Sequence, residues 1–344
     1  MKFNVGVIGT GITQHTLSGV KDDPRLNIQA FVDLNEEKLK ETADKWGATG
    51  RYQDAYEMID KEDLDIVYVA TPNKFHAPIS IYALENGAHV FCEKPMAINA
   101  KEAKEMQNVA DRVGKRIMIN HSFRFTEQAW QLKKEVDSGT FGDIYFGRTV
   151  WHRRRGMPGF GGWFGNKEIA GGGPLIDLGV HRLDMALWLM GYPKPVWVMG
   201  STYDHIATRI ATEQGKEFTV EDLASAMIKF ENGGSLIVEA SWASNRKENE
   251  FMVTELYGTE GGLIQRNLDE GYAFEAEIYL ERNGAQFDSK LHPPVPAAEH
   301  QFGHFMNCIE NDVPHISSGN EGIIVMELLD AIYKSAEIGE PVRL

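Results

Sequence analysis

One segment of the sequence combines a flexible turn with two side chains suited to proton transfer. Three glycines at positions 171–173 precede Pro174, which suits the first position of a helix, and apolar residues then recur with a helical period. Asp177 and His181 are four residues apart and therefore share a helix face, with Asp184 three residues further on. Histidine is the natural general base near neutral pH, and a carboxylate one turn away can orient it or bind a hydroxyl group. The pattern predicts an acid–base site.

Two other interpretations of this segment stay open at the level of sequence. Asp177 and His181 could form an ordinary ion pair on the surface of a helix. Together with Asp184 they could also ligate a divalent ion. No second cluster of metal-ligating residues accompanies them, so the sequence predicts no metal site.

A turn near the N-terminus is suited to holding a dinucleotide. Gly9 and Gly11 follow a strand-like run and precede a helix that opens with Ile12. Glycines in this place allow a tight turn and bring backbone amides close to a pyrophosphate. The third glycine of the usual fingerprint is missing, because Gln14 occupies its place.

A carboxylate at the end of the next strand strengthens this interpretation. Asp33 follows about 20 residues after the glycines, where a carboxylate binds a ribose hydroxyl and repels a 2′-phosphate. Its alternative role is that of a helix N-cap. Leu34 and Asn35 add no cation for the extra phosphate, so the sequence favours NAD over NADP.

Polar residues also follow two later strands of the N-terminal half. Since parallel strands end at the ligand-binding edge of an open α/β sheet, we expect these residues at that edge. A lysine held between a buried strand and a proline is more fixed than a solvated surface lysine, so Lys94 is a candidate for proton transfer. The residues are Thr71, Pro72, Asn73, Glu93 and Lys94.

The order of elements predicts two domains of different architecture. In the first 121 residues, short apolar strands alternate with helices, which is typical of a parallel, doubly wound sheet. Residues 122–344 contain long strands and a helix over 175–190, which predicts a large, open and mostly antiparallel sheet. Asn232-Gly233-Gly234 predicts a hairpin turn between two of its strands. Two C-terminal helices, over 298–310 and 321–339, are expected to fold back and cover a domain.

Composition excludes several classes of function. The 344 residues include 35 Lys and Arg against 50 Asp and Glu, a net charge of −15, which argues against binding to nucleic acid or to anionic membranes. Two cysteines cannot build a disulfide framework, and no run of apolar residues is long enough to span a membrane. The N-terminus shows no secretory signal, so we expect a cytoplasmic protein.

Taken together, the motifs resemble the glucose–fructose oxidoreductase / inositol dehydrogenase / rhizopine-catabolism (Gfo/Idh/MocA) family. The similarity runs along essentially the whole chain, although Gln14 departs from the pattern. The motifs that carry it are Gly9-Thr10-Gly11, Asp33, Thr71-Pro72-Asn73 with His76, Glu93-Lys94-Pro95, Asn120 with Arg124-Phe125, and the segment from Gly171 to Asp184.

The resemblance implies a Rossmann domain that binds NAD and a catalytic set of Lys94, Asp177 and His181. A hydride would pass from a sugar or cyclitol carbon to NAD, while His181, assisted by Lys94, takes the hydroxyl proton and Asp177 positions a substrate hydroxyl. His76 is placed either beside the cofactor or as a structural residue at the start of a helix. The expected cofactor-binding residues are Gly9, Gly11, Ile12, Asp33, Thr71, Pro72, Asn73, His76, Glu93 and Lys94.

Further substrate contacts are expected from the second half, beside Asp177 and His181. They are His121 and Arg124 at the domain junction, Arg153, and Trp163. Arg153 opens a run of three arginines, which could anchor substrate oxygens or form a surface or subunit contact. Trp163 could stack on a sugar or nicotinamide ring, or belong to a core or interface.

We therefore expect a NAD-dependent dehydrogenase that oxidises a secondary hydroxyl of a sugar, glycoside or cyclitol. One alternative is a NAD-dependent enzyme that cleaves a glycoside through transient oxidation and elimination. Another is a nucleotide sensor without turnover, which the presence of Lys94 and His181 disfavours. One face of the second sheet is not covered by helices of its own half, which predicts sheet-to-sheet association; the resemblance implies homodimers or homotetramers.

Overall fold

The computed structural model describes residues 2–344, and these divide into two compact units. The first unit runs to Asn120 and also includes Glu299–Met326, while the second comprises His121–Ala298 and Glu327–Leu344. The predicted division at residue 121 allowed for a return of the C-terminal helices to the first domain. By contact, residues 299–326 belong to the first unit, and the chain passes between the units inside one helix, α11 (Gly319–Ile338).

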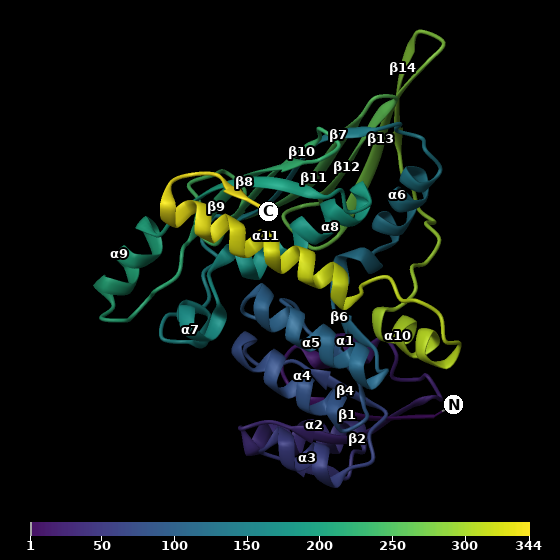
Figure 1. The fold of residues 1–344 in the computed structure, drawn as a ribbon, viewed down its shortest axis with the longest axis vertical. Helices are drawn as coiled ribbons and strands as arrows, with labels where there is room; N and C mark the ends of the chain where they lie inside the picture. The colour runs from purple at the N-terminus through teal and green to yellow at the C-terminus, as the bar shows by residue number, and fades with distance from the viewer. Residues whose placement is uncertain (1) are drawn as a thin grey trace. The chain divides into compact units, whose positions relative to one another are not determined.

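The first unit is built on a six-stranded parallel sheet with the order β3-β2-β1-β4-β5-β6 (Figure 1). The strand order reverses direction between β1 and β4, and in such sheets ligands bind outside the carboxyl ends of the strands at this point. The elements are β1 (Phe3–Ile8), α1 (Thr13–Ser18), β2 (Leu26–Val32), α2 (Glu36–Trp46), β3 (Gly50–Tyr52), α3 (Ala55–Lys61), β4 (Ile66–Val69), η1 (Asn73–Phe75), α4 (His76–Glu85), β5 (His89–Cys92), α5 (Ala100–Val113), β6 (Ile117–Ile119) and α10 (Gln301–Glu310).

Local capping fixes the helices of this unit where the sequence predicts them. The side chain of Asn35 accepts a hydrogen bond from the backbone of Lys38 at the start of α2, and Asn99 caps α5 in the same way. Gly47 and Gly114 end these helices in the left-handed conformation, with φ of 68° and 66°. Both helices therefore carry a side-chain cap at the start and a left-handed glycine at the end.

The second unit contains a nine-stranded sheet with the order β14-β13-β12-β11-β7-β10-β9-β8-β15. Neighbours are antiparallel except β7 and β10, which pair in parallel, so the predicted mostly antiparallel sheet is confirmed. Figure 1 shows the β13–β14 hairpin extending from one end of this sheet. The elements are η2 (Ser122–Phe125), α6 (Glu127–Asp137), β7 (Ile144–Arg153), η3 (Trp163–Gly165), α7 (Lys167–Ala170), η4 (Leu175–Gly179), α8 (Val180–Met190), β8 (Pro195–Tyr203), α9 (His205–Glu213), β9 (Leu223–Phe230), β10 (Ser235–Ser241), β11 (Glu250–Gly258), β12 (Gly261–Asn267), β13 (Phe274–Arg282), β14 (Ala285–Lys290) and β15 (Val342–Arg343).

The predicted helix over 175–190 consists of two different helices. Its first five residues, η4, form a π-helical turn in which the backbone N–H of Val180 donates to the carbonyl of Leu175. Its remainder, α8, is a regular α-helix that ends at Gly191. A π-turn inside a longer helix widens the backbone locally and is frequent at functional sites.

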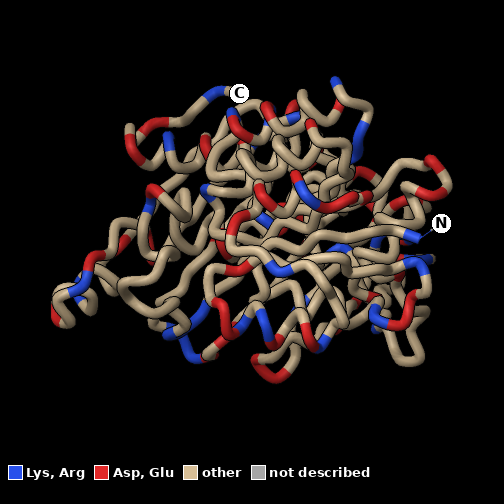
Figure 2. Tube along the Cα trace, turned by 90° about the horizontal axis from the view of Figure 1, so that it is seen from below, with Lys and Arg blue, Asp and Glu red and all other residues tan. Residues whose placement is uncertain are grey.

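Charge is distributed without a continuous basic stripe in the view of Figure 2, where Lys and Arg are interspersed among Asp and Glu. Both cysteines, Cys92 and Cys308, are buried and form no disulfide. None of the helices in residues 2–344 has both the length and the apolar character needed to cross a membrane.

Candidate functional site

The turn after β1 requires glycine at one position and leaves space at the next. Gly9 has a φ of +94°, and a Cβ built there would lie 2.3 Å from the carbonyl oxygen of Ala70, so no other residue fits. A Cβ at Gly11 would meet no protein atom within 4 Å. The side chain of Ile12 is 54% exposed beside it. The backbone at Gly11 is therefore open to an approaching ligand, whereas the N–H of Gly9 donates to the carbonyl of Val32 and that of Thr10 to Asp33.

Asp33 is held at the end of β2 by the same turn. One of its oxygens, Oδ2, accepts from the backbone N–H of Thr10 at 3.0 Å and from the Thr10 hydroxyl, and Oδ1 accepts from the N–H of Asn35 at 2.9 Å. Partial burial alone would raise the pKa of Asp33, but these hydrogen bonds lower it overall. Its neighbour Leu34 is 85% exposed. The arrangement presents an ionised carboxylate beside an uncovered apolar side chain.

His76 connects the loops that follow β4 and β5. Its Nδ1 lies 2.7 Å from the carbonyl oxygen of Pro95, and its Nε2 lies 2.9 Å from that of Thr71. Burial lowers the pKa of His76, with the two carbonyl contacts opposing this effect. The side chain is 1% exposed, so it holds the two loops together and acts as a structural residue. Lys94, half-buried, precedes Pro95 in a cis peptide bond.

The carboxyl ends of β4, β5 and β6 leave two buried polar atoms without a hydrogen-bond partner. Glu93 accepts from the hydroxyl of Tyr68 and, at 2.7 Å, from Nδ2 of Asn120, and burial raises its pKa. The remaining oxygen of Asn120, Oδ1, and the hydroxyl of Thr71 are unsatisfied. Because buried polar atoms are nearly always paired in native proteins, these two suit a polar ligand at this edge. The residues present therefore fit a bound dinucleotide.

In the second unit, the helix pair η4–α8 is almost completely buried. Between Gly172 and Leu189, every residue except Asp177 and His181 is buried. These two side chains are the points at which the segment reaches a partly open surface. The sequence singled out the same pair for acid–base chemistry.

Hydrogen bonds to the buried carboxylate of Glu221 fix the turn that carries Asp177. The carboxylate of Glu221 accepts from the N–H groups of Gly173 at 2.9 Å and Leu175 at 3.1 Å, and Tyr333 donates its hydroxyl to it at 2.9 Å. Burial raises the pKa of Glu221, and the backbone hydrogen bonds oppose this shift. A buried acceptor for these backbone N–H groups anchors the start of the π-turn.

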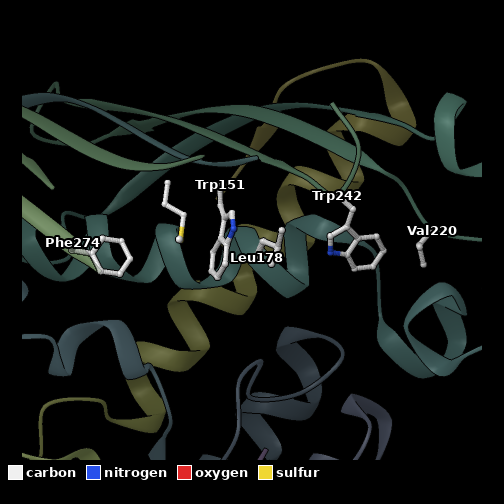
Figure 3. Packing of buried hydrophobic residues seen from close by; sticks show 6 residues of the cluster. Trp151, Leu178, Val220, Trp242 and Phe274 are labelled. Atoms are coloured by element: carbon white, nitrogen blue, oxygen red, sulfur yellow. The ribbon is translucent and has the colours of Figure 1, made fainter. Parts of the chain in front are cut away.

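A tryptophan from the sheet orients Asp177 directly. The indole Nε1 of Trp242 donates to Oδ2 of Asp177 at 3.0 Å, and Trp242 itself is fully buried. Figure 3 shows Trp151 and Trp242 projecting from the strands toward the helix below them, on either side of Leu178. The sheet thus supplies a rigid apolar layer behind the candidate site.

His181 lies against two aromatic rings of this layer. Its ring centroid is 4.9 Å from that of Phe123 and 5.4 Å from that of Trp151. Arg153 also packs over Trp151, with its guanidinium carbon 5.5 Å from the ring centroid, and forms an ion pair with Glu250 at 2.9 Å. The predicted substrate contact Arg153 therefore packs on the same tryptophan ring as His181, and Glu250 balances its charge.

Trp163 is connected to the Asp177 side of the site. It stacks on Phe164 with centroids 3.8 Å apart, and Phe164 in turn lies 6.4 Å from Trp242. Trp163 and Phe164 are half-buried. An aromatic surface of this kind is suited to the apolar face of a sugar ring.

Asp184, His121 and Arg124 form a separate, buried cluster. The guanidinium of Arg124 pairs with Asp184 through Nε at 2.9 Å, Nδ1 of His121 lies 3.0 Å from the same carboxylate, and Tyr192 donates to it at 3.0 Å. Burial alone would raise the pKa of Asp184, but the charges of Arg124 and His121 lower it overall. His121 is 2% exposed and Arg124 is fully buried, so the two predicted substrate contacts lie in a buried ion-pair cluster with Asp184.

The same cluster distinguishes Asp184 from Asp177 and His181, with which the sequence pattern grouped it. The carboxylate of Asp184 is occupied by Arg124 in the core, whereas Asp177 and His181 are partly open. Across residues 2–344, no three His, Cys, Asp or Glu side chains are grouped closely enough to hold a metal ion.

Several contributors to the site were not found from the sequence. The η4–α8 segment or its side chains are touched by Trp151 of β7, Trp242 directly after β10, the anchor Glu221 and the aromatic Phe123. Buried tryptophans on strands are an indication of a core, but sequence does not tell which helix they meet.

Comparisons with known proteins agree with both units. Residues 3–121 match a family model described as "Oxidoreductase family, NAD-binding Rossmann fold", and residues 129–264 match the "GFO/IDH/MocA C-terminal domain". The chain is 33% identical to D-glucoside 3-dehydrogenase of Escherichia coli (strain K12), over 93% of this chain and 90% of that protein. It is 24% identical to myo-inositol 2-dehydrogenase of Thermotoga maritima, over 99% and 98%. A solved structure of levoglucosan dehydrogenase in complex with NADH is 26% identical, with a TM-score of 0.87 over 100% of this chain and 99% of that one.

Proposed function

Because the chain belongs to the Gfo/Idh/MocA family of NAD-binding oxidoreductases, we propose that it oxidises a secondary hydroxyl group of a sugar, glycoside or cyclitol. Residues 3–121 are an NAD-binding Rossmann domain, and the enzyme is an NAD-dependent dehydrogenase. The similar proteins named D-glucoside 3-dehydrogenase, levoglucosan dehydrogenase and myo-inositol 2-dehydrogenase support a polyhydroxylated ring as the substrate class.

The single observation that carries the proposal is the exposure of Asp177 and His181 from an otherwise buried helix pair. A proton acceptor and a carboxylate that emerge together from a rigid, apolar support have the chemistry that alcohol oxidation needs. Trp242 holds the carboxylate, and Phe123 and Trp151 hold the imidazole in place. Preorganisation of this kind lowers the cost of aligning the reacting groups.

We assign the proton transfer to His181, with Lys94 as its assistant and Asp177 as the group that positions a substrate hydroxyl. NAD, when bound, supplies the hydride acceptor. His181 accepts the hydroxyl proton on its imidazole as the carbonyl group forms. The half-buried Trp163 is proposed to contact the sugar ring, and Arg153 its oxygens.

The cofactor is proposed to lie along the carboxyl edge of the first sheet. The open backbone at Gly11 would approach the pyrophosphate, and Asp33 would bind the ribose of the adenosine. Ile12 and Leu34 would cover apolar parts of the cofactor, which accounts for their exposure. The unsatisfied atoms of Thr71 and Asn120 would face the nicotinamide half. The loop residues Pro72, Asn73, Glu93 and Lys94 would line the same half.

Selectivity for NAD over NADP is proposed to come from the charge of Asp33. Its hydrogen bonds from Thr10 and Asn35 favour the ionised form, which repels a 2′-phosphate. The charge of Lys38 also favours the ionised form of Asp33.

We also propose association through the second sheet and a cytoplasmic location. Met199, Met227 and Ile237 occupy one row across β8, β9 and β10 and are at least partly exposed, which suits a sheet-to-sheet contact between copies. Sedimentation of the full-length protein tests the association. The two unlinked, buried cysteines are suited to a reducing compartment.

The proposed function is tested by a panel of sugars, glycosides and cyclitols with NAD, followed by the near-ultraviolet absorbance of NADH. His181→Gln and Lys94→Ala should bind NAD like the wild type in calorimetry, while oxidation falls by about 100-fold or more. Wild-type rates in either variant would contradict the assignment. Cleavage of a glycoside without accumulation of NADH would instead indicate oxidation followed by elimination.

A further inference from the structure

Arg182 is a buried cation without an ionic partner. It follows His181 on α8, its side chain is fully buried, and Nη1 donates to Oε1 of Gln265 at 3.0 Å. Two other donors, Nε and Nη2, are buried with no hydrogen-bond partner. In the part of the chain that the structure describes, no carboxylate pairs with this guanidinium; desolvation is the sole cause acting on its pKa, which it lowers to about 9. The side chain is therefore still protonated at neutral pH.

Aromatic rings take the place of a counter-ion around Arg182. Its guanidinium carbon lies over Phe123 at 4.8 Å, over Phe274 at 4.9 Å and near Trp151 at 6.0 Å from the ring centroids. Cation–π attraction compensates burial only in part. A well-packed apolar side chain would generally serve stability as well or better in such a place. The charge therefore calls for an explanation other than stability.

The rings that surround Arg182 also contact His181. Phe123 and Trp151 are shared between the two side chains, so no more than about 10 Å separates the guanidinium carbon from the centre of the imidazole. The rings that contact both groups are aromatic and Trp151 is buried, so charges interact more strongly here than in bulk water. A cation in this position disfavours a second positive charge on the imidazole.

Other charges near His181 are balanced by their own partners or belong to the proposed site. From η2, Arg124 is paired with Asp184, whose carboxylate His121 also approaches. From β7, Arg153 is paired with Glu250 of β11, and the neighbouring Tyr272 bonds to both. The strands β12 and β13 contribute the neutral Gln265 and Phe274. The remaining charged groups are Asp177, on η4, and Lys94, which the proposed function places beside His181. Among the arginines that the described residues of the second unit bring near His181, Arg182 is the one without an ion pair.

We propose that Arg182 is a positioning residue whose charge, acting across Phe123 and Trp151, keeps the His181 imidazole neutral and able to accept a proton at neutral pH. The inference rests on the proposed function of His181. It adds a reason for the buried charge, because a base that is protonated at the working pH cannot take up the hydroxyl proton.

The kinetic test is the pH profile of kcat/KM for sugar oxidation by Arg182→Met. Loss of the cation makes protonation of His181 easier, so the acidic limb of the profile should move to higher pH. At about 10 Å and an effective dielectric constant of about 20, the expected shift is roughly one pH unit. Phe274→Leu is the matched control, since it alters the same cage and keeps the charge. Its acidic limb should stay at the wild-type pH.

A direct test follows the imidazole resonances of His181 during a pH titration by NMR, with the signal identified by its absence in His181→Gln. The midpoint should rise by roughly one unit in Arg182→Met and remain unchanged in Phe274→Leu. This measurement needs no turnover. If His181→Gln oxidised the substrate at the wild-type rate, the proposed function would fail, while the titration would still decide the role of Arg182.

Stability separates the electrostatic role from a structural one. Arg182→Met should melt at or above the wild-type temperature, because an apolar side chain replaces an unpaired buried cation. If that variant does not fold, Arg182→Gln provides a second neutral side chain for the same titration. An unchanged midpoint and acidic limb in the neutral variant would overturn the proposal, and so would an equal shift in Phe274→Leu.

Discussion

Replacing Trp242 with phenylalanine removes one hydrogen-bond donor from Asp177 and leaves an aromatic ring in the buried layer of the second sheet. The contact in question joins Nε1 of Trp242 to Oδ2 of Asp177 at 3.0 Å. Trp242 is fully buried, whereas Asp177 is half-buried. The variant therefore changes the orientation of the carboxylate more than its access to water.

The size of the effect follows from the kind of hydrogen bond that is lost. A hydrogen bond to a charged group contributes about 1.5–3 kcal/mol. If all of it served the transition state, kcat/KM would fall by roughly 10- to 150-fold. Since Asp177 is partly open, water replaces some of the lost interaction. We therefore expect a decrease of about tenfold.

The assay is a double-mutant cycle on the rate of NADH formation. Trp242→Phe should lower kcat/KM in the wild-type background and have little effect when Asp177→Ala is already present, because the acceptor is then gone. Phe218→Leu is the matched control, as Phe218 packs 6.4 Å from the Trp242 ring and makes no contact with the carboxylate through a hydrogen bond. It should retain a rate close to that of the wild type.

Two results would contradict the role of the Trp242–Asp177 hydrogen bond. Equal losses from Trp242→Phe in both backgrounds would mean that the tryptophan acts independently of Asp177. An equally large loss in Phe218→Leu would mean that packing of the aromatic layer, rather than the hydrogen bond, determines the rate.

Three further predictions concern the support of the two units. Asp33→Ala should raise the KM for NAD by about tenfold and reduce discrimination against NADP, because the carboxylate that repels a 2′-phosphate is removed; steady-state kinetics with both cofactors measure this. Asp184→Asn should lower the free energy of unfolding by about 3–5 kcal/mol in urea titrations at neutral pH, because Arg124 is left buried without its counter-ion. The folded-state pKa of Asp184 is lowered, so its contribution exists at neutral pH and should disappear as the pH falls below about 4. Gly9→Ala should cost about 1–3 kcal/mol and weaken NAD binding in calorimetry, since the new Cβ would meet the carbonyl of Ala70.

Each of these predictions has a result that counts against it. Unchanged cofactor preference in Asp33→Ala would remove the ribose role of this carboxylate. Equal stability of Asp184→Asn and wild type at neutral pH would mean that the buried ion pair contributes nothing net. Normal NAD affinity in Gly9→Ala would mean that the turn tolerates a side chain after all.

The architecture was predictable where local chemistry determines it. The helices that end at Gly47 and Gly114 have both a capping asparagine and a left-handed glycine, and the sequence contains both signals. The strand β14 was missed, because all of its residues are exposed and no apolar alternation marks them. The strands β3 and β15, of three and two residues, are too short to leave a pattern.

At the candidate site, the sequence identified the reactive pair but not its surroundings. Asp177 and His181 are recognisable because the motif is continuous in the chain, whereas Trp242 lies 65 positions from Asp177 and meets it only through the sheet. Arg124 reaches Asp184 over 60 positions in the same way, which is why Asp184 was grouped with the acid–base pair. The π-turn was also missed, since five residues are too few to distinguish its period from that of an α-helix.

The proposed reaction moves a hydride from a ring carbon to NAD while His181 accepts the hydroxyl proton. The most direct measurement supplies wild type and His181→Gln with a substrate from the active part of the sugar and cyclitol panel, deuterated at its ring carbons, and follows the label into the reduced cofactor by mass spectrometry. We predict that the wild type transfers deuterium to the nicotinamide and that His181→Gln, saturated with NAD, does so at least about 100-fold more slowly. Reduced cofactor without deuterium, or equal transfer by both proteins, would contradict it.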